Sequence, residues 1–148
     1  SEIYATGAAL VDPEIGKAGD IDTAATVLRF ENGVIGTINN SRKAVYGHDQ
    51  RVEVLGSGGM AATSNNMSDG TIYSNADSVH TAPPLWFFIE RYTDAYIAEM
   101  IEFIECVREG KTPSVTGSDG RVPVVMGHAA KKSFEENRPV RLSEIDAG

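Results

Sequence analysis

The amino-acid sequence predicts an α+β fold, in which a largely antiparallel (mixed) open-faced sheet carries two long helices packed on one face. Strand-like runs separated by tight-turn residues fill the first half of the chain. Apolar residues recur every three or four positions in the second half, as on the buried side of a helix. Strands that precede helices, without alternating with them, are typical of this class. We expect residues 1–148 to form a single domain, because a chain of this length buries about 70% of its unfolded surface.

Turn- and loop-forming residues mark the bounds of the first strands. Residues 3–10 alternate loosely and predict a strand, whereas residues 11–20 have the proline and glycine content of a loop. A hairpin follows, in which residues 23–31 and 34–41 flank the pair Asn32-Gly33. That pair predicts a two-residue type I′ turn, since both of its central positions need a positive φ.

A glycine-rich segment raises the question of a nucleotide site. Residues 56–61 fit G-x-G-x-x-[GA], the pattern of a dinucleotide-binding turn. The pattern requires a following helix whose N-terminus faces the pyrophosphate, but residues 62–70 show no helical periodicity. We therefore interpret the segment as a turn between strands at 51–55 and 60–64, and expect no cofactor-binding residue here. A further short strand is possible at residues 71–74.

The first long helix follows Pro83-Pro84 and ends at Gly110. Its apolar stripe consists of Phe88, Tyr92, Ala95, Tyr96, Met100, Phe103, Ile104 and Val107. Tyr92 and Tyr96, four residues apart, are expected to be core residues.

The second long helix begins at a capping box, in which Thr116 serves the amide of Asp119. Asn137 is its expected C-cap and Pro123 its expected first-turn proline, and residues 138–142 can form a closing strand. Its stripe consists of Val122, Met126, Ala129, Ala130, Ser133 and Phe134.

Charge and composition exclude several classes of partner. The formal net charge is −8, from 13 basic and 21 acidic residues, so nucleic acid and anionic membranes are not expected partners. No apolar run approaches the roughly 18 residues that span a bilayer. Cys106 is the single cysteine, which fits a buried thiol and a cytoplasmic protein. Residues 1–5 resemble a strand already under way, so we expect the chain to start inside a larger protein.

The hairpin is apolar on both of its faces. Ala24 and Leu28 point to one side, and Ala25 and Val27 to the other. The two helices cover one face, so a partner domain, a partner subunit or both must cover the second. We expect a homodimer or homotetramer that assembles through the open sheet face.

Residues 39–51 gather amides, hydroxyls, cations and a histidine where strands leave the sheet. Such groups can hydrogen-bond a polyhydroxylated ligand. The alternative is a set of solvated turn charges, including Asp49 and Arg51. The histidines His48, His80 and His128 fit no metal-ligand pattern, so no metal site is expected.

Several segments together resemble the C-terminal domain of the Gfo/Idh/MocA oxidoreductases, most closely the inositol 2-dehydrogenases. Residues 22–60 match its sheet, including "YG.D.." and "V.G..G", and residues 87–142 match its helices, including "RY..AY..E...F" and "G.DG". The resemblance covers about residues 3–142. Where the family has Y-G-Y-D, this chain has Tyr46-Gly47-His48-Asp49.

The resemblance implies a two-domain enzyme that transfers hydride between a cyclitol or sugar C–OH and NAD or NADP. The family's N-terminal Rossmann domain holds the cofactor, and its catalytic E-K-P and D-x-x-x-H motifs belong upstream of this chain. No catalytic residue is therefore assigned here. The expected substrate-binding residues are His48, Arg42, Tyr46 and Asn40, and His48 takes the place of an aromatic residue near the substrate. The alternative is a stand-alone sheet-mediated dimerisation or sugar-binding module without redox activity.

Overall fold

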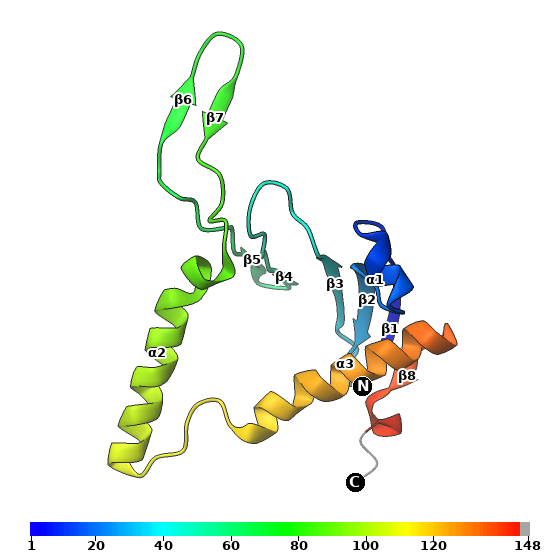
Figure 1. Ribbon diagram of the computed structural model, residues 1–148. Helices are drawn as coiled ribbons and strands as arrows, with labels where there is room; N and C mark the ends of the chain where they lie inside the picture. The colour runs from blue at the N-terminus through cyan, green and yellow to red at the C-terminus, as the bar shows by residue number, and fades with distance from the viewer. Residues whose placement is uncertain (146–148) are drawn as a thin grey trace. The chain divides into compact units, whose positions relative to one another are not determined.

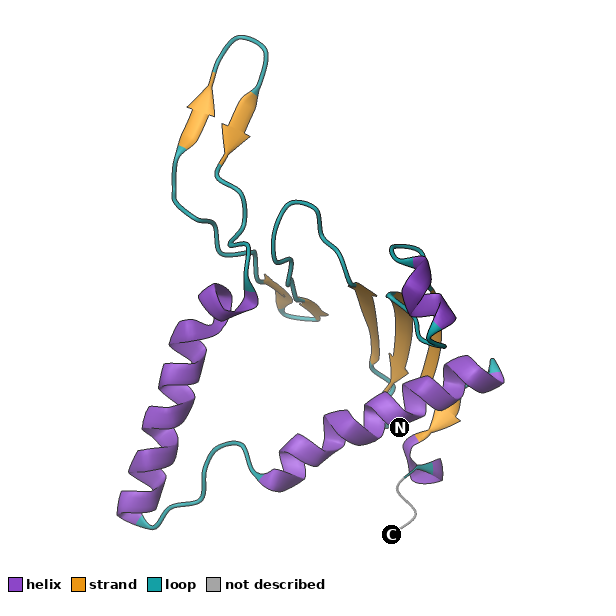
Figure 2. Ribbon diagram, in the orientation of Figure 1, coloured by secondary structure: helices purple, strands orange, loops and turns teal. Residues whose placement is uncertain are grey.

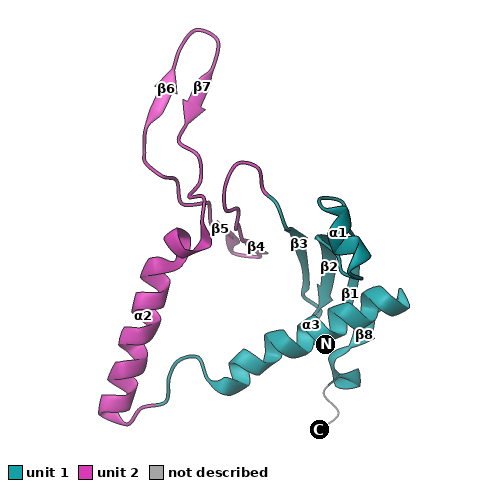
Figure 3. Ribbon diagram, viewed as in Figure 1, with its two compact units in different colours: residues 1–43, 112–148 teal, residues 44–111 magenta. Residues whose placement is uncertain are grey.

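The computed structural model describes residues 1–145, which divide into two compact units (Figure 3). Unit 1 comprises residues 1–43 together with the described residues from Thr112 onward, and unit 2 comprises Ala44–Lys111. Unit 1 contains the main sheet and one long helix, whereas unit 2 contains two hairpins and the other long helix.

Unit 1 is built on an antiparallel sheet with the strand order β3-β2-β1-β8 (Figure 2). Its strands are β1 (Glu2–Ala8), β2 (Thr23–Arg29), β3 (Ile35–Ser41) and β8 (Val140–Arg141), and a short 3₁₀ turn, η1 (Leu142–Glu144), follows β8. The first strand, the hairpin and the closing strand expected from the sequence are thus confirmed.

The hairpin between β2 and β3 does not use the type I′ turn expected of Asn32-Gly33. Phe30 N donates to Val34 O at 2.9 Å, and Gly33 N donates to Phe30 O at 3.1 Å, which makes a three-residue loop. Gly33 has φ +85, whereas Asn32 keeps a negative φ and its Oδ1 accepts from Val34 N at 3.2 Å. This loop needs a positive φ only at the glycine, so the conformational cost falls on the residue that tolerates it.

The segment predicted as a loop at residues 11–20 contains a short helix, α1 (Pro13–Lys17). Asp12 caps it, because its Oδ1 accepts from Glu14 N at 2.9 Å, and Pro13 supplies the fixed φ that suits a first helical position. One turn of helix is too short for apolar periodicity to reveal it, which explains the wrong prediction.

A buried carboxylate ties this segment to the sheet. Asp22 is only 6% exposed, and it accepts hydrogen bonds from the backbone N–H groups of Leu10, Val11 and Asp12, each at 2.8 Å. Thr23 Oγ1 donates a fourth hydrogen bond at 2.9 Å. Burial alone would raise the pKa of Asp22, but the hydrogen bonds outweigh it and lower the pKa to about 2.

The helix of unit 1 is α3 (Gly117–Glu136), and both of its expected caps are confirmed. Asp119 Oδ2 accepts from Thr116 N at 2.8 Å, and Asn137 ends the helix with φ +50. The expectation for Pro123 is wrong. The helix starts at Gly117, so the proline lies inside it, one turn later than expected, on an exposed part of the surface.

The hydrophobic core of unit 1 lies between α3 and the sheet (Figure 1). Ile3 is 3% exposed, and Ala129 and Val140 are fully buried. Partly buried apolar side chains pack around them: Leu28, Met126, Ala130, Leu142 and Ile145. The expected stripe of α3 is largely confirmed, since Ala129 and Ser133 are buried and Met126 packs against the core, but Val122 is exposed and Val125 is buried in its place.

Strand register identifies the two faces of the sheet. Leu28 pairs with Ile3 and packs against the core, so α3 covers the face that carries Leu28. Val27 pairs with Tyr4 and points to the opposite face, where it is 43% exposed and Ile35 is 69% exposed. The open apolar face expected from the sequence is therefore the one that carries Ala25 and Val27.

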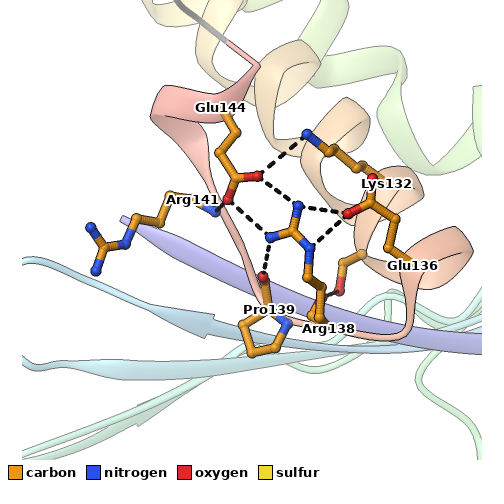
Figure 4. Close-up of polar contacts among 7 residues, drawn as sticks. Lys132, Glu136, Arg138, Pro139, Arg141 and Glu144 are labelled. Atoms are coloured by element: carbon orange, nitrogen blue, oxygen red, sulfur yellow. Dashed lines mark hydrogen bonds and ion pairs between the residues drawn. The ribbon is translucent and has the colours of Figure 1, made fainter.

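An ion-pair cluster holds the end of unit 1 together (Figure 4). Glu144 Oε2 lies 2.7 Å from Arg138 Nη2 and 3.3 Å from Lys132 Nζ, and Glu144 Oε1 accepts from Arg141 N at 3.0 Å. Arg138 Nε also donates to Glu136 Oε2 at 2.7 Å. The Arg138 guanidinium and the Arg141 N–H lower the pKa of Glu144 to about 2. Because Lys132 belongs to α3, its contact with Glu144 joins the segment after β8 to that helix.

Unit 2 contains two separate hairpins. β4 (Glu53–Gly56) pairs with β5 (Gly59–Ala62), and Gly56 lies opposite Gly59 across the turn. β6 (Ile72–Ser74) pairs with β7 (Val79–Thr81). The glycine-rich segment is thus a turn between antiparallel strands, as expected, whereas β7 was not predicted.

The long helix of unit 2 is α2 (Phe88–Glu109), which ends as expected at Gly110 with φ +64. Cys106 is its one buried residue. Most of its large apolar side chains are exposed: Phe88, Ile89, Tyr96, Ile97, Met100, Ile101, Phe103, Ile104 and Val107. Neither α2 nor any other helix within residues 1–145 is long and apolar enough to cross a membrane.

Candidate functional site

The four expected substrate-binding residues divide between the two units. Asn40 lies in β3, opposite Ala24, and Arg42 follows that strand, with its backbone N–H donating to Asp22 O at 2.8 Å. The side chains of Asn40 and Arg42 are exposed. Tyr46 and His48 lie together in unit 2, in a segment of residues 46–51 that we call the His48 loop.

The centre of the His48 loop is the carboxylate of Asp49, whose side chain is 16% exposed. Asp49 Oδ1 accepts from Arg51 Nε at 2.8 Å and from Asn65 Nδ2 at 2.7 Å. Asp49 Oδ2 accepts from Arg51 Nη2 at 2.9 Å and from the hydroxyl of Tyr46. Asp49 is therefore a shielded, hydrogen-bonded anion, whereas Arg51, whose side chain is 67% exposed, fits the alternative of a solvated turn charge.

These contacts set the protonation of the loop. The Arg51 guanidinium, followed by the Tyr46 hydroxyl and the Asn65 amide, holds the pKa of Asp49 well below its usual range. The hydrogen bond from the Tyr46 hydroxyl to Asp49 raises the pKa of Tyr46, because the carboxylate holds the hydroxyl proton. Asp49 is thus an acceptor that stays charged, and Tyr46 is a donor that stays neutral.

The backbone before His48 needs a glycine. Gly47 has φ +133, and a Cβ at that position would lie 2.8 Å from Pro84 O. This close approach lets His48 N donate to Leu85 O at 2.8 Å, so the loop is joined to the segment that leads into α2.

The half-buried imidazole of His48 meets a tyrosine of α2. The rings of His48 and Tyr92 lie edge to face, with centroids 5.6 Å apart and an interplanar angle of 81°. The Tyr92 hydroxyl donates to Gln50 Oε1, and Arg91 Cζ lies 5.5 Å from the centroid of the Tyr92 ring. Among the described residues, Arg91 Nε is the one buried side-chain nitrogen or oxygen without a hydrogen-bond partner.

Tyr92 was expected to be a core residue, and the structure corrects this. Its ring lies against the His48 loop, and Tyr96 is 50% exposed. A four-residue spacing of aromatic residues is the same for a core stripe and for one residue that faces a loop, so periodicity could not separate them.

The His48 loop suits hydrogen bonding to hydroxyl groups. An imidazole can donate from one ring nitrogen and accept at the other. In unit 1, the exposed guanidinium of Arg42 supplies donors only. Within residues 1–145, no group of three His, Cys, Asp or Glu side chains is arranged to hold a metal ion. The turn at Gly56–Gly59 leads into β5, so it has no helix N-terminus with which to hold a pyrophosphate.

Known proteins resemble the chain over nearly its whole length. The myo-inositol 2-dehydrogenase of Thermotoga maritima is 48% identical over 144 residues, which are 97% of this chain and 43% of that protein. The inositol 2-dehydrogenase of Rhizobium meliloti is 38% identical over 95% of this chain and 43% of that protein. This chain thus spans less than half the length of these relatives.

Solved structures have the same fold. A probable dehydrogenase from Thermotoga maritima matches with a TM-score of 0.94 at 48% identity, over 97% of this chain and 43% of that chain. The myo-inositol dehydrogenase from Lactobacillus casei, in complex with NAD(H) and myo-inositol, matches with a TM-score of 0.78 at 25% identity, over 94% of this chain and 40% of that chain.

The family model of the Gfo/Idh/MocA C-terminal region, described as "Oxidoreductase family, C-terminal alpha/beta domain", matches residues 4–142. The chain therefore belongs to the Gfo/Idh/MocA oxidoreductase family, and it corresponds to the C-terminal α/β domain of that family.

Proposed function

We propose that this chain is the substrate-binding and assembly domain of an NAD(H)-dependent dehydrogenase that oxidises a C–OH group of inositol or a closely related cyclitol or sugar. The observation that carries the proposal is the 48% identity to a myo-inositol 2-dehydrogenase over 97% of the chain. Membership of an oxidoreductase family argues against a stand-alone binding or dimerisation module.

The described residues indicate which part of the enzyme would bind the cofactor. The glycine-rich turn lacks the helix that a pyrophosphate requires, so the cofactor would be bound by an N-terminal Rossmann domain outside residues 1–148. When bound, NAD supplies the hydride acceptor. The Lactobacillus casei relative in complex with NAD(H) favours NAD over NADP. We place the enzyme in the cytoplasm, where the NAD(H) pool is found.

In this proposal the protein contacts uncharged polar groups of the substrate, its hydroxyls. His48 and Arg42 would donate hydrogen bonds to ring hydroxyls, and Tyr46 and Asn40 are the other two proposed substrate-binding residues. The support is twofold: His48 lies in the Tyr46-Gly47-His48-Asp49 segment on which the family resemblance rests, and its half-buried ring is held against Tyr92. Substrate specificity in such sites comes from a few fixed polar groups.

The open face of the sheet would be the assembly surface. Val27 and Ile35 are 43% and 69% exposed on a face that α3 does not cover. A two-fold pairing of this face with a second copy would bury both in one self-complementary contact, giving a homodimer, or a homotetramer if a second interface forms.

The experiment that tests the function is a substrate and cofactor survey with the full-length protein. We expect reduction of NAD⁺ with myo-inositol or another inositol isomer, and weaker or no reduction of NADP⁺. Reduction with linear polyols but with no cyclitol would contradict the proposed substrate class, and no reduction with any polyol would contradict the proposed activity.

A further inference from the structure

The His48 loop is joined to two distant parts of unit 2. His48 N–H donates to Leu85 O at 2.8 Å, and Gln50 N–H donates to Asn65 Oδ1 at 2.8 Å. The Tyr92 hydroxyl donates to Gln50 Oε1, beside the edge-to-face contact of Tyr92 with His48. The position of the imidazole therefore depends on contacts made by its neighbours in the loop.

We propose that Asp49 is a positioning residue for substrate binding: by gathering Tyr46, Arg51 and Asn65 around one carboxylate, it holds the His48 loop in the conformation that directs the His48 imidazole to a substrate hydroxyl. The inference rests on the proposed function, because it takes His48 as the group that touches the substrate.

The chemistry of the cluster requires a carboxylate. Each oxygen of Asp49 accepts two hydrogen bonds, and Arg51 spans both oxygens through Nε and Nη2 at 2.8 and 2.9 Å. An asparagine would replace one acceptor oxygen by an NH₂ donor, which would face the guanidinium and a second donor, either Tyr46 or Asn65. The amide thus keeps the shape of the side chain, but in either orientation its NH₂ group opposes an N–H of Arg51, and the two-point pairing with the guanidinium is lost.

Apart from these contacts with Leu85, Asn65 and Tyr92, the loop has little else to hold it. Arg51 is exposed for most of its side chain (67%), and unit 2 has few buried residues. A loop without an apolar core depends on its polar contacts for order. Loss of the Asp49 cluster would therefore release His48 into several conformations, of which only one suits the substrate.

Asp49 itself is a poor candidate for a substrate contact. Its side chain is 16% exposed, and its two oxygens are already engaged by four donors. Its effect on binding must therefore pass through the loop, which distinguishes a positioning residue from a binding residue.

The test is a double-mutant cycle in the full-length, NAD⁺-saturated protein with myo-inositol as the probe. Asp49→Asn should raise KM about 10- to 100-fold, the cost of a contact group misplaced by about an ångström, with a smaller change in kcat. In the His48→Ala background, Asp49→Asn should raise KM by about twofold or less, since the group that it positions is gone. If Asp49 had only a structural role, Asp49→Asn would raise KM by the same factor in the His48→Ala background.

Two further variants distinguish a loss of positioning from a loss of folding. Asp77→Asn makes the same replacement of an oxygen by an NH₂ group in an exposed carboxylate elsewhere in unit 2, and it should leave KM unchanged. If Asp49→Asn fails to fold, Asn65→Ala removes one donor from the Asp49 cluster and one acceptor from Gln50, and it should show the same dependence on His48 at a smaller size.

The outcomes separate this inference from the proposed function. Equal effects of Asp49→Asn with and without His48, or no effect where His48→Ala has one, would overturn the positioning role alone. An unchanged KM in His48→Ala itself would overturn the proposed substrate contact, and the inference with it.

Discussion

The imidazole of His48 lies edge-on to the ring of Tyr92, with the ring centroids 5.6 Å apart, although the two residues are separated by two hairpins in the sequence. The contact joins a loop that follows the main sheet to the first turns of α2. This ring contact and the hydrogen bond from His48 N to Leu85 O limit the positions that the imidazole can take.

Gly47 should not tolerate a side chain. Gly47→Ala places a Cβ 2.8 Å from Pro84 O at a backbone φ of +133, so we expect a loss of about 1–3 kcal/mol in the free energy of unfolding. Gly58→Ala is the matched control, since nothing lies within 4 Å of its Cβ position. Urea denaturation of both variants measures the difference, and equal stability would show that the loop relaxes around the methyl group.

Asp22 should make the stability of unit 1 depend on acid. Its folded-state pKa of about 2 lies below the ordinary value of 3.8, so its contribution is present above about pH 4 and is lost as the pH falls through 2. In Asp22→Asn, the amide NH₂ would face backbone N–H donors, so the variant should be less stable at pH 7.

The measurement for Asp22 is the free energy of unfolding of both proteins between pH 7 and about pH 2. The gap between them should narrow toward the acid end, and other carboxylates cancel because both proteins contain them. A gap that stays constant over this range would show that Asp22 contributes no charged hydrogen bonds.

The two faces of β2 should respond in opposite ways to a charge. Val27 lies on the open face, so Val27→Glu should prevent assembly and leave the fold intact. Leu28→Glu points into the core beside Ile3, Ala129 and Val140, so it should cost about 2–4 kcal/mol of stability. Light scattering and thermal melting distinguish the two results, and a monomeric unmutated protein at high micromolar concentration would contradict assembly through this face.

The chain by itself should not bind the cofactor. The turn at Gly56–Gly59 opens no helix, so we expect no NAD(H) affinity when residues 1–148 are titrated in a calorimeter. Saturable micromolar binding that is lost in Gly58→Val would show that this turn holds a nucleotide after all.

Local signals predicted the parts of the fold that are encoded locally. Thr116 and Asn137 mark the ends of α3 by their own side chains and backbone preferences, so both could be identified from the sequence. The Asn32-Gly33 turn was found but given the wrong type, because the sequence does not show that the asparagine side chain would hydrogen-bond Val34 N. The stripe of α3 was largely identified, but Val122 was chosen in place of Val125, because small residues on several faces satisfy the same periodicity.

Only part of the candidate site could be predicted from the sequence. The polarity of residues 39–51 singled out His48 and Tyr46, but the partners that hold them, Asn65 and Tyr92, lie 16 and 42 residues from the loop positions they bond. Such pairs are created by tertiary structure, and no spacing rule along the chain predicts them.

The measurement that tests the central claim most directly is the steady-state oxidation of myo-inositol by the full-length protein and by its His48→Ala variant. We expect NAD⁺ reduction by the unmutated protein, and a loss of about 1–3 kcal/mol in kcat/KM for the variant, about 5- to 150-fold, with the Kd for NAD⁺ nearly unchanged. Identical kinetics for the two proteins with every cyclitol that is oxidised would show that His48 is only a turn residue. Failure of the unmutated protein to oxidise any cyclitol would contradict the account as a whole.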